Sequence, residues 1–386
     1  MRQIHCGIIG FGFMGPQHAE AIRRLGFVHI GAICAADPQA ARQKAALLGI
    51  PRVYEHYEEM LDDPTIEVVD IVTPTRLHRP IALAAIAHGK HVIVDKPLAL
   101  SLDQAREMRD AALAAGVVNA VTFNYRYHPL VQQARFMARN GDVGPIHLVH
   151  GHYLQEWLLK ESDFSWRLDP SESGPSAMVG DAGCHWFDLV EHVTGLRITS
   201  VLAELRTVIP TRQKPLRPRQ AFAEAGNEET EPYSVTVPDL GAMLLRLNNG
   251  GTASFLASPL CAGHKNDLQF TIHGSKLSLS WRQEDPNHLF IGRRGQPDLV
   301  LNRDPALLAP EARRYTSLPG GHSEGWPDAF RNTLSSVFEF IAGNGDPRSA
   351  DTVLYPTFAD GCRAAAISDA LVRSGAEGGV WVDVEP

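Results

Sequence analysis

The first third of the chain alternates short apolar runs with stretches whose apolar residues recur at helical spacing. The apolar runs lie at residues 4–10, 27–34, 66–74, 90–97 and 117–125. Such runs are typical of strands buried on both faces, and the intervening segments have the period of amphipathic helices. This alternation predicts an α/β fold with a doubly wound parallel sheet of the Rossmann type.

Beyond about residue 125 the pattern changes to longer segments in which apolar and polar residues alternate. These segments cover residues 146–157, 198–209, 241–258, 267–281 and 288–295. Period-two alternation indicates strands with one buried face, and Asn- and Gly-rich turns at 248–251 and 274–275 indicate antiparallel neighbours. We therefore predict a second, α+β domain with an open, mainly antiparallel sheet. Residues 210–231 lack periodicity, which predicts a long excursion that covers a ligand site, joins subunits or is a solvated loop.

Composition and charge narrow the possible partners. The 386 residues carry a net charge of −8 and the sequence pI is about 6.1. Without a basic excess, binding to nucleic acid or an anionic membrane is not expected. No apolar stretch approaches the ~20 residues of a membrane span and the start has no signal-peptide pattern, so we predict a cytoplasmic protein. The five scattered cysteines lack C-x-x-C spacing, which predicts neither disulfides nor a zinc knuckle.

The residues GFGFMG, directly after the first apolar run, place Gly10, Gly12 and Gly15 in a G-x-G-x-x-G pattern. In a strand–turn–helix unit the first glycine permits the tight turn, and the second lets backbone N–H groups approach a pyrophosphate. The third lets the helix pack close to the strand. The pattern alone also fits an ordinary glycine turn, but its position after a predicted strand favours a dinucleotide site. Phe13 and Met14, inside the turn, are expected to contact the cofactor.

The end of the second predicted strand bears on the choice between NAD and NADP. A carboxylate about 20 residues beyond the glycines normally binds the adenosine ribose, and here that position holds Ala35, followed by Asp37. If Asp37 turns towards the ribose, NAD is favoured; if it points to solvent, Arg42 or Lys44 can reach the 2′-phosphate of NADP. Asp37 also fits a turn before Pro38. The sequence predicts NAD or NADP and leaves both open.

Two segments at later predicted strands contain longer motifs than the glycine pattern. They are TPTRLH at 73–78 and GKHVIVDKP at 89–97. They resemble the glucose–fructose oxidoreductase, inositol dehydrogenase and rhizopine catabolism (Gfo/Idh/MocA) family, which has T-P-N-x-x-H followed by G-K-H-V and E-K-P. Thr75 replaces the usual Asn and Asp95 the usual Glu, and both keep hydrogen-bonding capacity. The resemblance continues through residues 124–129, 165–170, 180–189 and 381–384. It implies cofactor contacts from Thr73, Pro74, Thr75, His78, Asp95, Lys96, Trp166 and Arg167.

Lys96 is the candidate acid/base group. Oxidation of a secondary alcohol removes the hydroxyl proton while the hydride of the same carbon passes to nicotinamide C4. Lys96 follows a central strand and can supply this group if partial burial and neighbouring positive charge lower the pKa of its amine. The family resemblance implies this role and a cis Lys96–Pro97 peptide that aims the lysine. An isolated Lys-Pro pair would instead indicate a surface turn.

A predicted helix within residues 180–195 supplies partners for the lysine. Asp181, His185 and Asp188 lie at i, i+4 and i+7 and share one face. By resemblance to the family, His185 lies against the reacting hydroxyl as acid/base or hydrogen-bond partner, and Asp181 positions the substrate and tunes the lysine. A helix cap at Asp181 and a metal held by this set are alternatives. We predict no metal, because no further ligand cluster is evident; Cys184 is expected in the core.

Substrate contacts are predicted by class, since sugars and cyclitols are bound by planar hydrogen-bonding groups beside an aromatic platform. The candidates are Lys96, Arg126, Tyr127, Tyr153, Trp166, Asp181, His185 and His322, with Trp157, Arg167 and His264 of the same kind. His322 is favoured because a Gly-Gly-His turn presents its imidazole on a tight backbone, although this segment also fits the lead-in to a helix before Pro327.

These features predict an NAD(P)-dependent dehydrogenase that oxidises a ring hydroxyl of a sugar, glycoside or cyclitol. Residues 1–124 are then the dinucleotide-binding domain and residues 125–386 the domain for substrate binding and oligomerisation. Two alternatives are an NADPH-dependent reductase of a keto- or anhydro-sugar and a non-catalytic regulator that senses the dinucleotide. The joint presence of Lys96, Asp181 and His185 weighs against the regulator. The resemblance also implies a homo-oligomer, a dimer or tetramer, with the second-domain sheet as its interface.

Overall fold

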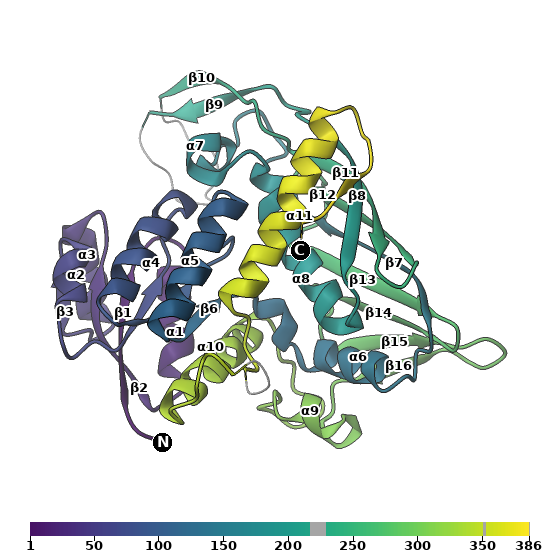
Figure 1. Ribbon diagram of the computed structural model, residues 1–386, viewed down its shortest axis with the longest axis horizontal. Helices are drawn as coiled ribbons and strands as arrows, with labels where there is room; N and C mark the ends of the chain where they lie inside the picture. The colour runs from purple at the N-terminus through teal and green to yellow at the C-terminus, as the bar shows by residue number, and fades with distance from the viewer. Residues whose placement is uncertain (217–228, 350–352, 386) are drawn as a thin grey trace. The chain divides into compact units, whose positions relative to one another are not determined.

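The computed structural model describes residues 1–216, 229–349 and 353–385, which form two compact units (Figure 1). The first unit comprises Met1–Phe123 and Phe330–Ala365, and the second comprises Asn124–Ala329 and Ala366–Pro386. The excursion predicted at 210–231 falls partly outside the described residues, which exclude 217–228. Helices α10 (Trp326–Ala342) and α11 (Phe358–Ala376) contribute residues to both units.

The first unit contains the predicted parallel sheet. Its strands are β1 (Ile4–Ile9), β2 (Val28–Cys34), β3 (Arg52–Tyr54), β4 (Val68–Ile71), β5 (His91–Val94) and β6 (Asn119–Val121). They pair in the order β3-β2-β1-β4-β5-β6, and every pair is parallel. The order reverses at β1 and β4, and in such sheets ligands bind beyond the carboxyl ends of the strands at the reversal. The Rossmann-type prediction is confirmed.

Helices connect these strands, and single residues determine both ends of one of them. The helices are α1 (Gly15–Arg23), α2 (Pro38–Leu47), α3 (Tyr57–Leu61), the 3-10 turn η1 (Thr75–Leu77), α4 (His78–Ala87) and α5 (Leu102–Ala115). The Ser101 hydroxyl caps α5 by accepting a hydrogen bond from the Gln104 N–H at 3.3 Å. Gly116 ends the same helix with φ +67°, the left-handed conformation that glycine adopts without strain. Helices α4 and α5 lie side by side along the sheet (Figure 1).

A late part of the chain, residues 330–365, belongs to the first unit, which the sequence pattern did not predict. The Val121 N–H at the end of β6 donates to the Pro356 carbonyl at 2.9 Å. Asn119 Oδ1 accepts a hydrogen bond from the Phe358 N–H at the start of α11, also at 2.9 Å. The Phe330 ring packs edge-on against His18 of α1, with 4.6 Å between ring centroids. These contacts join segments more than 200 residues apart in sequence.

The second unit is built on a large mixed sheet. Its strands are β7 (Ile146–Leu154), β8 (Ile198–Arg206), β11 (Leu240–Leu247), β12 (Thr252–Ser258), β13 (Asp267–Gly274), β14 (Ser278–Arg282), β15 (His288–Gly292), β16 (Leu299–Asn302) and β17 (Val382–Asp383). The order is β16-β15-β14-β13-β7-β12-β11-β8-β17. Only β7 and β12 pair in parallel among these described strands, and the other neighbours are antiparallel. The predicted open, mainly antiparallel sheet is confirmed.

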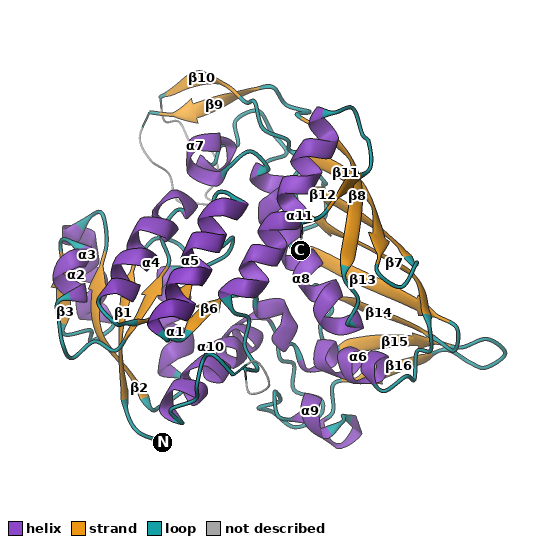
Figure 2. Cartoon of the chain, viewed as in Figure 1, coloured by secondary structure: helices purple, strands orange, loops and turns teal. Residues whose placement is uncertain are grey.

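Helix α8 (Ala177–Thr194) packs on one face of this sheet together with α6 (Pro129–Arg139), as Figure 2 shows. The side chains on the covered face, such as Phe255, Phe270 and Trp281, are fully buried. Alternate residues point to the opposite, outer face, where Leu244 and Leu256 are exposed. The remaining short helices are η2 (Asn124–Tyr127), η3 (Trp166–Leu168), α7 (Pro170–Ser173), η4 (Pro305–Leu307) and α9 (Pro310–Arg313).

The described ends of the excursion form a small antiparallel ribbon of β9 (Thr211–Pro215) and β10 (Thr230–Ser234). Arg212 is fully buried at its base and pairs with Asp239 at 3.4 Å. Its guanidinium also donates to three backbone carbonyls, those of Leu158, Lys160 and Asp163. The ribbon is therefore fixed to the segment that follows β7.

No helix within the described ranges is long and apolar enough to cross a membrane. All five cysteines are free thiols and four are buried, Cys184 among them, as predicted for a core residue.

Candidate active site

The three glycines of the first turn have three different surroundings. Gly10 has φ +96°, and a Cβ there would lie 2.5 Å from the Val72 carbonyl oxygen. A Cβ on Gly15 would lie 2.9 Å from both the Gly10 carbonyl oxygen and the Phe11 ring. Around Gly12, by contrast, no heavy atom of the described residues lies within 4 Å of the Cβ position. The turn is thus packed on the protein at Gly10 and Gly15 and open at Gly12, which suits the approach of a pyrophosphate.

The residues around the glycines also fit an anion. Met14 is the N-cap of α1, and the first turn of that helix has no acidic residue. The positive end of the helix dipole and its unsatisfied N–H groups favour a negative charge there. Phe13 lies in the turn with its side chain exposed. Lys44 of α2 donates to the Phe11 carbonyl at 3.0 Å, which adds a cation beside the turn.

Beyond β2, the residues considered for ribose recognition have protein partners. Asp37 is the N-cap of α2, with Oδ1 accepting a hydrogen bond from the Ala40 N–H at 2.9 Å. Arg42 forms an ion pair with Glu55 at 2.5 Å. Ala35 follows β2 and is half-buried. The turn role considered for Asp37 is therefore present, and the ribose roles of Ala35 and Asp37 stay predictions.

A fully buried ion pair lies between α1 and β4. His18 Nδ1 is 2.8 Å from Asp70 Oδ2, and neither side chain is exposed. Burial lowers the pKa of His18, but the charge of Asp70 and the hydrogen bond outweigh it, so the pKa of His18 is raised above its ordinary value. The pair ties the helix of the glycine turn to the strand that precedes the next loop.

His78 joins the two loops that carry the family motifs. Its Nδ1 lies 2.9 Å from the Pro97 carbonyl and its Nε2 lies 2.9 Å from the Thr73 carbonyl. The ring is buried, and this burial lowers the pKa of His78. A neutral imidazole has one N–H to donate, so each tautomer bonds to one of the two carbonyls. His78 thus holds the loop after β4, which contains Pro74 and buried Thr75, against the loop after β5.

At the end of β5, Asp95 and Lys96 adopt a defined arrangement. Asp95 Oδ1 accepts hydrogen bonds from the Lys96 N–H at 2.9 Å and from the Thr122 hydroxyl at 2.5 Å. The Lys96–Pro97 peptide is cis, as the family resemblance implied. Lys96 itself is half-buried. Thr122 was missed in the sequence, although its position directly after a parallel strand was the signal that could have found it.

In the second unit, the three polar residues of α8 have separate partners. Asp181 Oδ2 lies 3.4 Å from Arg167 Nε. Asp188 pairs with Arg126, whose Nε donates to Asp188 Oδ2 at 2.7 Å and whose terminal nitrogen bonds to the other carboxylate oxygen. The His185 ring meets the Tyr125 ring edge-on, with 4.7 Å between centroids. Because α8 begins at Ala177, Asp181 lies inside the helix, and the alternative of a helix cap at this residue is wrong.

Tyr125, Tyr153 and Asn266 form a closed hydrogen-bond ring beside His185. The Tyr153 hydroxyl donates to Asn266 Oδ1 at 2.6 Å, and Asn266 Nδ2 donates to the Tyr125 oxygen at 3.0 Å. The Tyr125 and Tyr153 oxygens are 3.0 Å apart, which closes the ring with Tyr125 as donor. Burial and then the neighbouring Tyr125 raise the pKa of Tyr153 well above its ordinary value. Sequence reasoning named Tyr153 as a substrate candidate. It gave Tyr125 no role, although this residue lies in the stretch 124–129 that resembles the family, and it missed Asn266, which no local pattern marks.

The other predicted substrate residues differ in their exposure and in their contacts. Tyr127 is only 1% exposed and packs on Tyr315 and Ala329 in a small core cluster. The Arg167 guanidinium lies over the Trp166 ring, 4.5 Å from its centroid. His322 is exposed on its turn, as its loop position suggested. Their roles towards substrate stay predictions.

Two further aromatic and imidazole candidates also have protein contacts. Trp157 Nε1 donates to Gln155 Oε1 at 3.1 Å. His264 bonds to Asp267.

The candidate residues divide between the two units by predicted role. Those assigned to the dinucleotide from Gly10 to Lys96 all belong to the first unit. Trp166, Arg167, Asp181, His185 and the other predicted substrate residues belong to the second.

Comparison with known proteins identifies the class and then the family. Residues 4–123 match the family described as an oxidoreductase family with NAD-binding Rossmann fold, which makes the chain an NAD-binding oxidoreductase. Residues 131–280 match the GFO/IDH/MocA C-terminal domain, and the chain belongs to the Gfo/Idh/MocA oxidoreductase family.

Several relatives are similar over the full length of the chain. The levoglucosan dehydrogenase of Pseudarthrobacter phenanthrenivorans is 32% identical, covering 100% of this chain and 99% of the relative. A solved structure of levoglucosan dehydrogenase in complex with NADH and levoglucosan is 30% identical, with a TM-score of 0.88 and 100% coverage of both chains. An inositol dehydrogenase homolog from Azotobacter vinelandii, in complex with NAD+, is 28% identical with a TM-score of 0.86, covering 99% of this chain and 97% of its own.

Proposed function

We propose that the protein is an NAD(P)-dependent dehydrogenase that oxidises a ring hydroxyl of a sugar, glycoside or cyclitol. The observation that carries this proposal is the full-length likeness to a levoglucosan dehydrogenase whose solved structure contains NADH and levoglucosan. The likeness to an inositol dehydrogenase homolog with NADH and myo-inositol extends the substrate class to cyclitols. Both relatives support a polyhydroxylated ring as the substrate in this proposal.

The dinucleotide site is assigned to the glycine turn and the two motif loops. The open position at Gly12 fits a pyrophosphate, and the helix end at Met14 and Gly15 supplies N–H donors. Phe13, Ala35 and Asp37 line the adenosine side in this proposal, and the residues of the later loops line the nicotinamide side. These later residues are Thr73, Pro74, Thr75, His78, Asp95 and Lys96, with Trp166 and Arg167 from the second unit. When bound, nicotinamide supplies the hydride acceptor.

The proton-transfer roles are assigned to Lys96, His185 and Asp181. As the substrate carbon loses its hydride, the Lys96 amine takes the proton of the hydroxyl on that carbon, which leaves a carbonyl. His185 holds or shares this proton at its imidazole, and its ring orientation is supported by edge contact with Tyr125. Asp181 positions the substrate. The remaining predicted substrate contacts, Arg126, Tyr127, Tyr153, Trp166 and His322, belong to the same proposal.

Cofactor choice follows from the end of β2. Ala35 offers no carboxylate to repel a 2′-phosphate, so we expect NAD and NADP both to bind. The complexes of the relatives with NADH and NAD+ support the use of NAD.

A homo-oligomer, a dimer or tetramer, joined through the outer face of the nine-stranded sheet is part of the proposal, as is a cytoplasmic location. Leu148, Leu244, Leu256 and Phe290 point to that face and are exposed, which favours a second copy of the chain as its cover. Light scattering on the purified protein measures the state, and Leu256→Glu should give monomers.

The activity is tested by following NADH absorbance with a panel that contains levoglucosan, myo-inositol and simple pyranosides. We expect reduction of NAD with at least one ring substrate, loss of turnover in Lys96→Ala, and normal turnover in the surface control Lys276→Ala. Reaction only with keto-sugars and NADPH would establish the reductase instead. Tight dinucleotide binding without turnover on any substrate would favour the regulator.

A further inference from the structure

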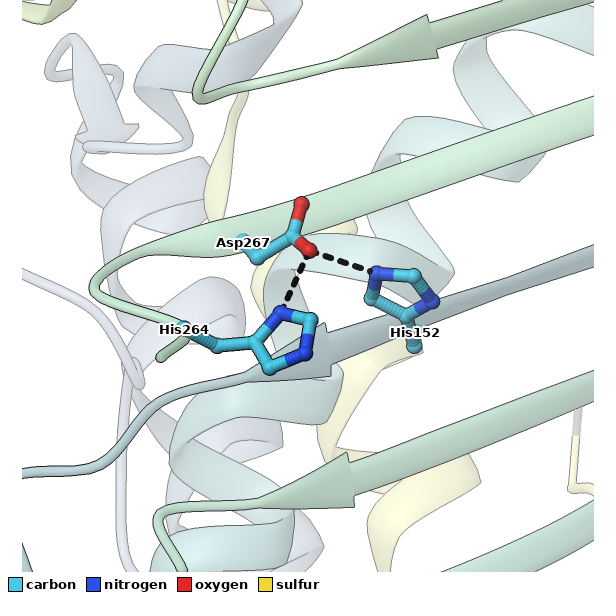
Figure 3. Close-up of side chains that lie close together, drawn as sticks. All are labelled: His152, His264 and Asp267. Carbon is cyan, nitrogen blue, oxygen red and sulfur yellow. Dashed lines mark hydrogen bonds and ion pairs between the residues drawn. The ribbon is translucent and has the colours of Figure 1, made fainter. Parts of the chain in front are cut away.

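Two histidines and an aspartate converge at one end of the second-unit sheet (Figure 3). His152 lies on β7, Asp267 begins the neighbouring strand β13, and His264 lies in the loop just before it. His152 Nε2 is 3.1 Å and His264 Nδ1 is 2.7 Å from the same oxygen, Asp267 Oδ2. One nitrogen or oxygen atom of each residue lies within 4.8 Å of the others.

The two carboxylate oxygens of Asp267, at the centre of this group, have different surroundings. Asp267 is 2% exposed, whereas the two imidazoles are half-exposed. Its contacts with His152, with His264 and, at 3.2 Å, with Arg282 all converge on Oδ2. The other oxygen, Oδ1, is buried and has no hydrogen-bond partner in the described part of the chain. A buried polar atom without a partner calls for an additional group, such as an ion or water.

We infer that His152, His264 and Asp267 bind a divalent transition-metal ion, with Zn²⁺ as the preferred ion. Two imidazole nitrogens and one carboxylate oxygen are a donor set that Zn²⁺ takes, with water in the fourth position. Ligand bonds of about 2.0–2.2 Å separate tetrahedral ligand atoms by roughly 3.3 Å. The separations of 3.1 and 2.7 Å from His152 Nε2 and His264 Nδ1 to Asp267 Oδ2 are close to this value, and all three ligand atoms lie within 4.8 Å of one another. Each imidazole binds through its lone pair, and the N–H proton that now points at Asp267 moves to the other ring nitrogen or to solvent.

The surroundings favour a preformed site. The loop that carries His264 is held at its end by Glu284 Oε1, which accepts hydrogen bonds from the backbone N–H groups of Lys265 and Asn266 at 2.7 and 2.9 Å. The Arg282 cation competes with a metal, but its side chain is half-exposed and also reaches Glu284 Oε2 at 3.3 Å. The guanidinium can therefore remain paired with Glu284 when the ion occupies Asp267.

This site is separate from the proposed catalytic residues. His152 points to the outer face of the sheet, whereas Tyr153, the next residue, points to the face covered by α8. The inference does not rest on the proposed function, and it is tested without cofactor or substrate.

The experiment uses the full chain, freed of metal by a chelator and then titrated with Zn²⁺ by calorimetry and with Co²⁺ by visible absorption. We expect the protein to bind one equivalent of each ion. The Co²⁺ spectrum should be that of an ion with a low coordination number, and Zn²⁺ should raise the unfolding temperature. His264→Gln should bind at least about 10–100-fold more weakly, the cost of losing only a supporting partner of a metal ligand. Asp267→Asn should do the same, and circular dichroism checks that both variants are folded.

The matched control is His288→Ala. His288 Nδ1 lies 2.6 Å from Asp285 Oδ1 in the same three-residue spacing as His264 and Asp267, but the pair is exposed and belongs to no three-residue ligand cluster in the part of the chain that the structure describes. This variant should bind the metal as wild type does. The inference is overturned if wild type takes up less than one equivalent at micromolar metal, or if His264→Gln binds as tightly as the His288→Ala control.

Discussion

Replacing Gly12 by alanine should weaken dinucleotide binding while it stabilises the free protein. No atom of the described residues lies within 4 Å of the new Cβ, and the backbone is outside the left-handed region, so the folded chain accepts it without strain. The loss of glycine's freedom in the unfolded chain then adds about 0.4–1 kcal/mol to the free energy of unfolding. The same methyl keeps the pyrophosphate from the backbone, and losing one charge-assisted hydrogen bond costs about 1.5–3 kcal/mol, roughly a 10- to 150-fold rise in Kd.

Gly15→Ala is the matched comparison, because the same methyl group there meets the protein. Its Cβ would lie 2.9 Å from a backbone oxygen and from the Phe11 ring, and neither can move without shifting the turn. Overpacking of this kind costs about 1–3 kcal/mol of unfolding free energy. The two variants should therefore change stability in opposite directions.

Urea unfolding followed by circular dichroism gives the stability of each variant without cofactor, and calorimetry gives the Kd for NADH. Gly12→Val, with a larger side chain, should abolish binding and leave the protein folded. An unchanged Kd for NADH and NADPH in Gly12→Ala, or a loss of more than about 1 kcal/mol in its stability, would refute the assignment of this glycine to the cofactor.

Three further predictions concern burial, mechanism and cofactor choice. Asp70→Asn should destabilise the protein by about 3–5 kcal/mol, since it leaves buried His18 without its counter-charge. The pKa of His18 is raised on folding, so the ion pair stabilises the protein fully below about pH 6.5. This stabilisation is lost as the pH rises through the pKa of His18 in the folded protein. Urea unfolding should therefore show a smaller difference in stability between Asp70→Asn and wild type at pH 9 than at pH 6. Lys96→Ala and His185→Ala should each lower turnover by roughly 10²–10⁴-fold at saturating cofactor. The double variant should lose little more than either single variant, because the two groups act as a unit. Near-normal turnover in Lys96→Ala would exclude the mechanism. Ala35→Asp should shift the ratio of Kd values towards NAD, and no shift in an enzyme already specific for NAD would indicate that another group contacts the ribose.

The strands and helix ends were predictable where one residue or one period determines them. The apolar runs marked the six parallel strands apart from the short edge strand β3. A helix end is predictable in the same way where a capping residue such as Ser101 or Gly116 determines it. The place of residues 330–365 was not predictable, because it depends on backbone bonds such as that from Val121 to Pro356, which leave no mark on hydrophobic period.

The candidate site was likewise predictable only where a local motif marks its residues. The glycine pattern and the resemblance led to the motif loops, whereas the partners of the candidate side chains come from distant segments. Asn266 reaches Tyr125 across 141 positions of sequence, and His152 reaches Asp267 across 115. The prediction of no metal stays a prediction; it rested on spacing along the chain, and spacing cannot reveal that His152, His264 and Asp267 lie together at the ends of two neighbouring strands.

The return of residues 330–365 to the first unit sets an order of events during synthesis. The whole six-stranded sheet is translated within the first 123 residues, yet the contacts that Asn119, Val121 and His18 make with Phe358, Pro356 and Phe330 need residues near the other end of the chain. At 5–20 residues per second, roughly 10–50 s pass before those partners emerge from the ribosome. For that interval the nascent dinucleotide-binding sheet lacks these contacts, so the edge at β6 and the part of α1 that meets Phe330 are open to chaperones while the second unit is being made.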